Sequence, residues 1–432
     1  MSIVDRQPRT RLEQLAMQRR LGVADFLREF ARKAEAIGED VAVSRSAAKR
    51  WFQGGDSNPR TAARRVLESW FGEPIAELLG PPLSQSRQVT EQELAVNAAH
   101  ESVSHAIESA SALDPSALEH LHAAAGVAAR AYYITPPLEM LTDLVALRDT
   151  IYVQLDRTHK PLQQAELYLL AGQVCGLLSS VSWDLGLLGA AEEQARAAHT
   201  YGNVIDHPSL QAWARALQVT VAFWSGFPRR AAKIAAGALE TAPIGTASAR
   251  LHSVNARALA LLGARDEVRD QLDAATTELD RAGDDPFLDE IAGELAFDRA
   301  RRGLCAGAAY VALGDGDQAE HEAVAAVELF AGIPADQRWG AGELSAHVDL
   351  GAARTLRGDL AGAAAALQPV FALAPTRRTE AIAQRLQLLA RVLGTSRYRG
   401  ATEALQLGGA IEDFTSISLS RTTAMRALPP PS

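Results

Sequence analysis

Apolar residues recur at the three- and four-residue spacing of amphipathic α-helices along almost the whole chain. Alternation of β-branched and polar residues, the pattern of a half-buried strand, is nearly absent. Glycine and proline interrupt the helical pattern at short intervals, as expected between helices of about 10–20 residues. The pattern therefore predicts an all-α protein.

The same pattern divides the chain into four parts. At 432 residues the chain is too long for one compact core, so several domains or a repeat array are expected. A short helical unit covers residues 1–82, a polar linker covers 83–90, and a long array of helices covers 91–414. The remaining segment, 415–432, is rich in Ser, Thr and Pro and has the composition of a disordered tail.

The first unit is predicted to hold five short helices. Their expected ranges are 9–20, 24–37, 45–52, 59–71 and 74–79. Ser44 precedes the third helix as an N-cap, Gly54 ends that helix, and Pro59 opens the next one. Trp51 and Phe52 are expected to anchor the third helix in the core. Five short helices with a capped, basic third helix form the arrangement of repressor-type helix-turn-helix domains.

The third helix of this unit carries candidate DNA contacts. Small residues at its start leave the N-terminus narrow enough to enter a major groove, with Arg45, Ser46 and Lys49 pointing outward as base readers. Arginines at the start of the next helix suit phosphate contacts. The full set of predicted DNA-binding residues is Arg45, Ser46, Lys49, Arg50, Arg60, Arg64 and Arg65. The alternatives are a helical domain with solvated arginines and a degenerate helix-turn-helix kept for dimer contacts.

The long array contains a repeat anchored on glycines. The anchors are Gly186, Gly226, Gly263, Gly314 and Gly358, spaced 40, 37, 51 and 44 residues apart. Small residues stand seven positions before each anchor and five and twelve positions after it. This pattern predicts pairs of closely crossing antiparallel helices, with the glycine in the turn. The alternative is a helical bundle without a repeat.

The repeat resembles the tetratricopeptide repeat (TPR), in copies such as Tyr310, Gly314-Asp315 and Ala319. Residues 43–54, followed by Pro59, resemble the Xre/Cro-type helix-turn-helix family. Further motifs, including residues 62–68 and 167–173, are similar to those of actinomycete regulators that carry this head before a TPR body. The resemblance spans nearly the whole chain. It implies a five-helix DNA-binding domain followed by a TPR-like α-solenoid, and a homodimer bound to a double-stranded DNA operator.

By analogy with that family, the concave groove of the solenoid is the candidate ligand surface. Positions 13, 10, 6 and 3 residues before each anchor are expected to face it. The predicted groove residues are Gln173, Trp183, Trp213, Thr220, Phe223, Arg250, Ser253, Arg257 and Arg301. The set changes from aromatic to basic along the groove, which suits an amphipathic ligand with an anionic group, such as a peptide carboxylate. The alternative is that the aromatic residues pack in the core and the arginines are solvated.

The charge distribution separates the first unit from the rest. The chain has a net charge of -9, yet residues 1–80 carry 14 basic and 11 acidic side chains, a net of +3. The remainder has a net charge of -12. A basic head on an acidic body indicates that only the head approaches a polyanion.

Motifs for catalysis, metals and nucleotides are missing from the sequence. It has no HExxH, no GxxxxGK[ST] and no EF-hand carboxylate pattern. Cys175 and Cys305 lie far apart in apolar helical segments, so we expect buried, inert thiols and no disulfide framework. The expectation is a protein that is not an enzyme and uses no cofactor or metal.

The N-terminus has no apolar stretch of a signal peptide, and no apolar run approaches about 20 residues. A cytoplasmic protein without a membrane partner is therefore expected. The leading hypothesis is a sequence-specific transcription regulator whose body senses a small molecule or peptide, or docks a protein. The alternative hypothesis is a TPR interaction scaffold whose head no longer reads DNA.

Overall fold

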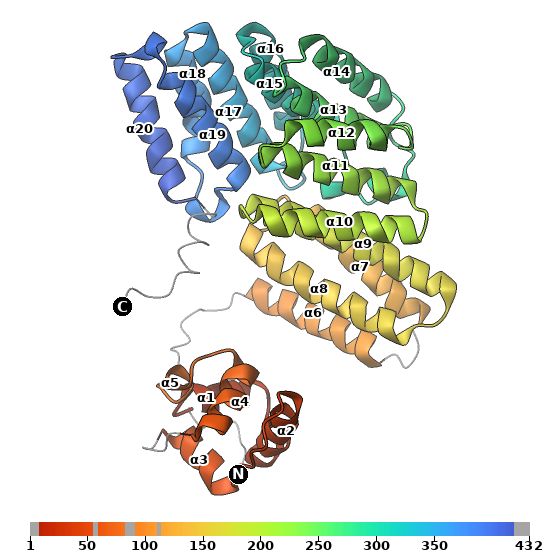
Figure 1. Cartoon of the computed structure of the whole chain (residues 1–432), viewed down its shortest axis with the longest axis vertical. Coiled ribbons are helices and arrows are strands. Elements are labelled where there is room, and N and C mark those ends of the chain that lie inside the picture. The colour runs from red at the N-terminus through yellow and green to blue at the C-terminus, as the bar shows by residue number, and fades with distance from the viewer. Residues whose placement is uncertain (1–7, 55–58, 83–90, 110–113, 419–432) are drawn as a thin grey trace. The chain divides into compact units, whose positions relative to one another are not determined.

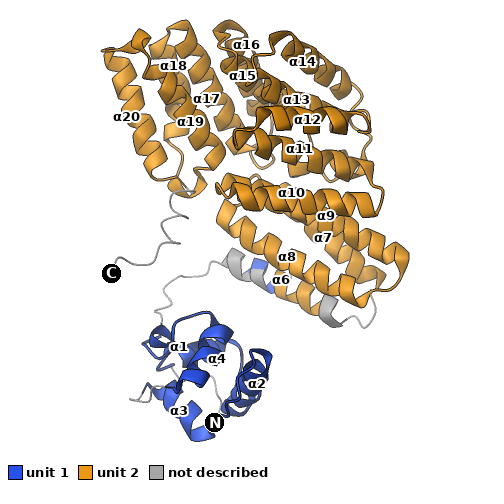
Figure 2. Cartoon of the chain, in the orientation of Figure 1, with its two compact units in different colours: residues 1–98 blue, residues 99–432 orange. Residues whose placement is uncertain are grey.

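The computed structural model describes residues 8–54, 59–82, 91–109 and 114–418. Within these ranges the chain is helical and contains no strand, which confirms the all-α prediction (Figure 1). The chain forms two compact units, residues 1–98 and 99–432, here called the head and the body (Figure 2). The predicted linker 83–90 lies outside the described residues.

The head contains α1 (Arg11–Gln18), α2 (Val23–Ala36), α3 (Arg45–Gln53), α4 (Thr61–Phe71) and α5 (Ile75–Leu78). Helix α4 begins two residues later than Pro59, because Arg60 still has an extended backbone with ψ of 154° and serves as the N-cap. An aromatic cluster forms the core of the head, in which Phe26 contacts the rings of Phe52, Trp70 and Phe71. These contacts join α2, α3 and α4.

The body begins with α6 (Glu91–Ser109), which crosses the boundary between the units, followed by α7 (Pro115–Ala131) and α8 (Pro137–Arg157). Six helical pairs follow. They are α9 (Pro161–Asp184) with α10 (Leu188–Val204), α11 (Pro208–Trp224) with α12 (Pro228–Leu239), α13 (Thr246–Ala260) with α14 (Arg265–Leu279), α15 (Arg299–Ala312) with α16 (Gly316–Ala331), α17 (Gly340–Arg357) with α18 (Leu360–Phe371), and α19 (Glu380–Leu393) with α20 (Thr402–Ser416).

The six pairs stack in two layers. The first helices of the pairs, from α9 through α11, α13, α15 and α17 to α19, contact one another in succession and form the inner layer. The second helices, α10 to α20, form the outer layer, and in the first five pairs each contacts a helix of the next pair (Figure 1). Helix α19 also contacts α9, so the inner layer closes on itself.

The anchor glycines occupy the turns within the first five pairs, as predicted. All have φ between 70° and 93°, a left-handed conformation that favours glycine. The small residues at the three fixed offsets from each anchor are buried where the helices cross. Gly351 shows the reason: an added Cβ would lie 2.9 Å from the side chain of Leu367 on the partner helix. The expected crossing of closely packed helices is confirmed at these positions.

The longest spacing between anchors corresponds to an insertion between α14 and α15. It contains a π-helical turn (Pro286–Glu290) and a 3-10 turn (Gly293–Leu295), which contact α11, α13 and α7. Gly293 has φ of 60°, and a Cβ there would lie 2.2 Å from the backbone oxygen of Ala129. The insertion therefore packs across the inner layer, with its backbone pressed against α7.

Helix α9 is long and apolar enough, by length and composition, to cross a membrane, and it is the only such helix in the described ranges. Of its most apolar window, 78% is buried inside the body. Its apolar character is thus explained by its central position in the inner layer. At the C-terminus, α20 extends to Ser416, so the first two residues of the expected tail are helical, and residues 419–432 lie outside the described part.

Candidate functional sites: a basic helix in the head and an arginine-lined cavity in the body

Helix α3 is fixed at both ends. The Ser44 hydroxyl accepts a hydrogen bond from the Ala47 amide at 3.2 Å, which confirms the predicted N-cap. Gly54 ends the helix with φ of 71°. Near that end the Thr10 hydroxyl, itself the N-cap of α1, lies 3.2 Å from the Trp51 carbonyl oxygen and donates to it. The backbone of α3 is therefore held in place by contacts that leave its outer face free.

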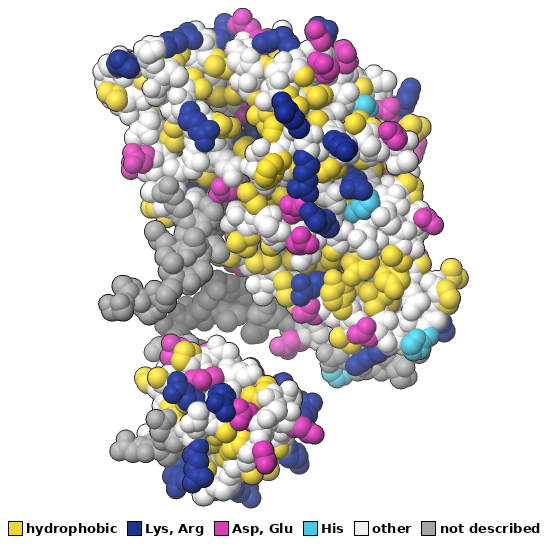
Figure 3. Space-filling model, viewed as in Figure 1, with side chains coloured by type: hydrophobic (Ala, Val, Ile, Leu, Met, Phe, Trp, Pro, Cys, Tyr) yellow, Lys and Arg dark blue, Asp and Glu magenta, His cyan; other side chains and the backbone are white. Residues whose placement is uncertain are grey.

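The outer face of α3 and the start of α4 is basic. All seven predicted DNA-binding residues are exposed, while Trp51 and Phe52 are buried beneath them, as expected. Figure 3 shows basic side chains on the surface over this part of the head. The exposed members are Arg45, Ser46, Lys49, Arg50, Arg60, Arg64 and Arg65.

These cations differ in their partners. Arg64 pairs with Glu68 at 3.0 Å and Arg65 with Glu39 at 2.6 Å. Four cations, by contrast, form no ion pair and no hydrogen bond with any residue that the structure describes. They are Arg45, Lys49, Arg50 and Arg60. A fixed helix thus presents unneutralised charge to solvent, which suits a polyanion.

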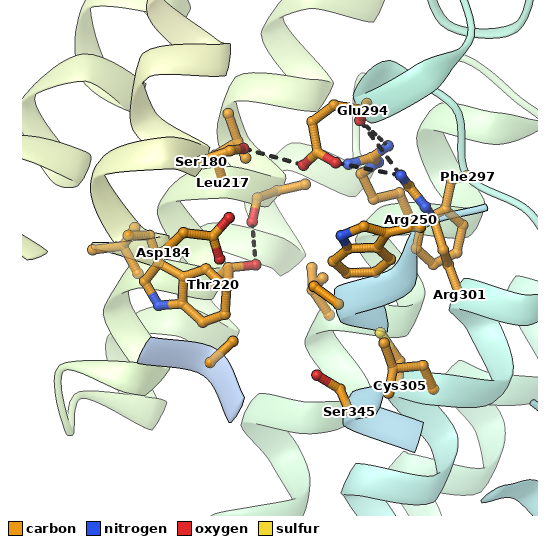
Figure 4. A pocket seen from close by; sticks show the side chains of 18 of the residues that line it. Ser180, Asp184, Leu217, Thr220, Arg250, Glu294, Phe297, Arg301, Cys305 and Ser345 are labelled. Atoms are coloured by element: carbon orange, nitrogen blue, oxygen red, sulfur yellow. Dashed lines mark hydrogen bonds and ion pairs between the residues drawn. The ribbon is translucent and has the colours of Figure 1, made fainter. Parts of the chain in front are cut away.

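The second candidate site is a cavity on the inner layer of the body, with a volume of about 940 Å3 that includes open solvent. Its walls come from α7, α9, α11, α13, α15, α17 and α19 and from the insertion. Figure 4 shows Asp184 and Thr220 on one side of it, with Arg250, Arg301 and Phe297 on the other. Because the insertion and the α9–α19 contact restrict the inner surface, the space is a pocket rather than an open groove.

Two buried arginines hold the insertion against the inner helices. Arg250 donates to the backbone oxygens of Glu294, Leu295 and Ala296 at 3.1, 2.8 and 2.6 Å. Arg301 pairs with the Glu294 carboxylate at 3.3 Å and donates to the Tyr133 hydroxyl. Burial, followed by the charge of Arg301, lowers the pKa of Arg250 to about 10. Both guanidinium groups therefore stay charged at neutral pH, and their hydrogen bonds close the cavity on this side.

The carboxylates of the cavity have unequal environments. Asp184 accepts a hydrogen bond from the Tyr132 hydroxyl at 2.6 Å, and burial raises its pKa to about 7. Glu294 accepts from the Ser180 hydroxyl at 3.1 Å and pairs with Arg301. Asp184 has no cationic partner within ion-pair distance among the described residues. It therefore changes charge near neutral pH, whereas Glu294 is held by a cation.

Two further arginines of the cavity, Arg257 and Arg385, come from α13 and α19. Arg385 pairs with Asp349 at 2.6 Å, and both side chains are almost fully buried. The Arg257 guanidinium lies 4.5 Å from the ring centre of Phe223 and 5.1 Å from that of Trp224. The Arg257 guanidinium has no hydrogen bond or ion pair with the described residues. Burial, followed by the charge of Arg385, lowers its pKa to about 10, so it too remains charged at neutral pH.

The cavity brings together part of the predicted groove set. Five of the nine predicted residues line it, and they come from positions 3, 6 and 13 before the anchors. These are Trp183, Thr220, Arg250, Arg257 and Arg301. Aromatic and basic side chains thus lie together at these positions, with Arg250 and Arg301 buried and Arg257 partly buried, and the binding of a ligand there stays a prediction.

The other four groove predictions are corrected by the structure. Gln173, Trp213, Phe223 and Ser253 are buried and do not line the cavity. Trp213 packs so closely on Gly176 that a Cβ there would lie 2.1 Å from the indole, and Phe287 of the insertion contacts its other side. The Phe223 ring does not line the cavity itself, but it contacts the guanidinium of Arg257, which does.

Several cavity residues were not anticipated from the sequence. Glu294 and Phe297 belong to the insertion, while Asp184, Trp339 and Arg385 fall outside the four offsets from the anchors. The one signal for the insertion is the 51-residue spacing between Gly263 and Gly314. That spacing indicates extra chain, but it does not indicate that the extra chain folds inward.

Within the described ranges, no group of three or more His, Cys, Asp or Glu side chains is placed to hold a metal ion. Cys175 and Cys305 are buried, and burial raises the pKa of both thiols, as expected for inert cysteines. In comparisons with known proteins, no protein-family model and no curated protein matches the chain.

Proposed function

We propose that the protein is a sequence-specific DNA-binding transcription regulator of the Xre/Cro helix-turn-helix type with a TPR-like sensor body. The observation that carries the proposal is the row of exposed, unpaired cations on α3, a helix fixed by its N-cap, its left-handed glycine and its aromatic core contacts. In this proposal α3 enters the major groove. Arg45, Ser46 and Lys49 read bases, and Arg50 and the arginines of α4 approach the phosphates.

The charges of the basic head and the acidic body support a model in which only the head binds DNA. The net charge of +3 over residues 1–80 favours DNA, while the net charge of -12 in the rest disfavours it. From the resemblance to Xre-type regulators, we further propose that the protein is a cytoplasmic homodimer whose two-fold axis matches that of a palindromic operator. No catalytic step, metal or cofactor enters this proposal.

The cavity supports a sensor role for the body. It combines apolar walls with a few convergent charged groups, a typical composition for a small-molecule site. Ligand binding would alter the packing of the inner layer and thereby the spacing of the two heads in a dimer. Such coupling requires the ligand to bind more tightly to one arrangement of the helices than to the other.

The experiment that tests DNA recognition is a pull-down of genomic fragments by the full-length protein at two salt concentrations, followed by sequencing. We expect a shared palindromic motif that survives the higher salt. Fragments without a motif that are lost as salt rises would indicate electrostatic attraction alone. That outcome would overturn the regulator proposal and favour the alternative, an interaction scaffold whose head no longer reads DNA.

Substitutions sharpen this test. Arg45→Ala and Lys49→Ala are each expected to weaken binding to the recovered motif by about 1–3 kcal/mol and to relax sequence preference. Arg60→Ala is expected to weaken binding to all sequences and to reduce the salt dependence by about one ion. Arg28→Ala is the matched control, because this head arginine is equally exposed but pairs with Asp25 on α2. Unchanged binding in the Arg45 and Lys49 variants would argue against α3 as the reading helix.

A further inference from the structure

The cavity contains more buried positive charge than its own residues neutralise. Four arginines line it, and two of them have carboxylate partners: Arg301 pairs with Glu294 and Arg385 with Asp349. Arg250 has no carboxylate partner among the described residues; one of its terminal nitrogens donates to backbone oxygens of the insertion, whereas its Nε is buried without a partner. Arg257 is left without a hydrogen-bonded or ion-paired partner among the described residues. Arg257 is partly buried, and a partly buried charge without a counter-ion is costly, so an anion beside it would stabilise this region of the body.

The surroundings of Arg257 contain further unused hydrogen-bond donors. The Nε atom of Arg385 is buried without a partner, and so is the indole nitrogen of Trp183. Both residues line the same cavity as Arg257. The rings of Phe223 and Trp224 cover one side of the Arg257 guanidinium. Several donors and an oriented, planar cation together form a receptor for oxygen atoms of an anion.

The rest of the cavity wall determines the chemical character of the ligand that carries the anionic group. Its remaining surface is formed largely by apolar side chains from the inner helices and by two large rings. The apolar wall residues include Leu217, Val221, Val254, Leu304, Phe297 and Trp339. Such walls favour a flat, apolar body.

Charge limits the ligand further. Glu294 lines the cavity and pairs with Arg301, and Asp184, whose pKa burial raises to about 7, carries a negative charge only as pH rises through neutrality. Both carboxyl groups would then oppose a second anionic group on the ligand. A single carboxylate suffices to pair with Arg257, because Arg250, which also lacks a carboxylate partner among the described residues, is already hydrogen-bonded to three backbone oxygens. Among the described residues, α19 contacts α9 and the insertion contacts α7, α11 and α13, which restricts the room for an extended peptide along the inner layer.

We infer that the body binds a small monocarboxylate with a flat apolar body, and that Arg257 holds its carboxylate. This inference deepens the sensor role proposed above and rests on it for its biological meaning. The binding itself is a separate property that can be measured without DNA. In the bound state the carboxylate takes the place of the missing partner of Arg257, while the ring system lies against the apolar wall.

The test uses the full-length protein and a panel of flat aromatic monocarboxylates, including benzoate, 2-naphthoate and indole-3-acetate. Each acid is compared with its uncharged amide, which has nearly the same shape. Binding is measured by titration calorimetry and by tryptophan fluorescence, since Trp183 lines the site. We expect saturable binding of at least one acid and weaker binding of its amide by about 10- to 100-fold, the ratio expected from the loss of one charge-assisted contact.

Substitutions test whether Arg257 is the residue that binds the carboxylate. Arg257→Met keeps a long apolar stem against Phe223 and Trp224 and should reduce acid binding to the level of the amide. Arg257→Lys retains the charge without the planar fork and should bind with intermediate affinity. Arg269→Met is the matched control, because this arginine is exposed on α14 and pairs with Asp266. Unfolding curves for each variant separate a loss of binding from a loss of structure.

Three results would overturn the inference. They are no binding of any acid at millimolar concentration, equal binding of acid and amide, and unchanged acid binding in a folded Arg257→Met protein. Tighter binding of a short peptide than of every acid would also contradict it. If the acid binds but leaves operator affinity unchanged, the binding inference stands and the sensor role fails. If the genomic pull-down yields no motif, the DNA-reading role fails irrespective of the cavity.

Discussion

The head and the body use the same side chain in opposite ways. On α3 the cations are exposed and form no ion pair with the described residues, and the helix carrying them is held by local contacts such as the Ser44 cap. In the cavity three of the four arginines, Arg250, Arg301 and Arg385, are buried and bonded to carboxylates or backbone oxygens, although the Nε atoms of Arg250 and Arg385 have no partner among the described residues. Exposed arginines interact weakly with their own protein and remain available to a polyanion, whereas buried arginines organise the fold around them. Substitutions in the head and in the body are therefore expected to have different effects.

The largest expected effect is in the body. Arg301→Met removes the partner of Glu294 and the hydrogen bonds from this arginine to the insertion. A buried carboxylate left without its cation is expected to lower the free energy of unfolding by about 3–5 kcal/mol. Urea unfolding of the full-length protein measures this loss. Arg299→Met is the control on the same helix, since Arg299 is about half exposed and should cost less than about 1 kcal/mol. Equal losses in the two variants would refute the contrast between buried and exposed arginines.

The next effect depends on pH. Burial raises the pKa of Asp184 from 3.8 to about 7, so the folded body holds this proton more tightly than the unfolded chain does. The stability contributed by the protonated group is complete below about pH 4 and is lost as pH rises towards 7. Asp184→Asn mimics the protonated form and can still accept the hydrogen bond from Tyr132. Its stability relative to the native protein should therefore increase by about 3 kcal/mol between pH 5 and pH 8.

Unfolding curves at the two pH values, with Asp149→Asn as the exposed control, measure this difference. The free energy of unfolding of Asp184→Asn relative to the native protein could also prove to be the same at both pH values. Asp184 would then already be ionised at pH 5. The cavity would then carry one more permanent negative charge, and the match to a monoanion would need to be recalculated.

A smaller effect is expected at the start of α3. Ser44→Ala removes the acceptor for the Ala47 amide and should destabilise this helix by about 1 kcal/mol. Amide hydrogen exchange along α3 reports the loss directly, and operator affinity should fall with it. Ser69→Ala, an exposed site in α4, is the control and should leave both unchanged. Unaltered exchange in the Ser44 variant would show that the aromatic contacts alone hold α3.

The smallest effect is expected at Arg257. Its contacts with Phe223 and Trp224 are favourable, but its charge is partly buried and has no counter-ion among the described residues, so the two contributions oppose each other. Arg257→Met should therefore change the free energy of unfolding of the ligand-free protein by less than about 1 kcal/mol. A loss as large as that of Arg301→Met would show that Arg257 is a structural residue and would weaken the carboxylate inference.

Local rules predicted the parts of the fold that depend on neighbours in sequence. The N-cap at Ser44, the left-handed glycines at the turns and the small residues at helix crossings were all read from fixed spacings. Pro59 was placed inside α4, although the extended backbone of Arg60 delays the helix to Thr61. Such an error of two residues is expected where capping depends on the chain entering the helix.

The cavity was predictable only in part, because its shape depends on chain segments that are distant in sequence. The offsets identified Arg250, Arg257 and Arg301, since these follow the repeat. They failed for Trp213, which is covered by Phe287 of the insertion. They also gave no indication of Asp184, which pairs with Tyr132 at the end of α7, or of Arg385, which pairs with Asp349 on α17. Repeat spacing therefore predicts the orientation of a side chain on its helix, but not what is packed over it.

The contact between the first and last inner helices has a consequence for how such a chain can evolve. In an open array, a gene duplication can add a helical pair at little cost, because each pair contacts only its neighbours. Here an added helical pair would separate α19 from α9. It would also break the hydrogen bond that the Arg377 guanidinium donates to the Ile134 carbonyl oxygen at 2.6 Å. The number of repeats is therefore fixed by ring closure. Descendants of this protein would be expected to diversify by changing side chains around the cavity rather than by changing the length of the array.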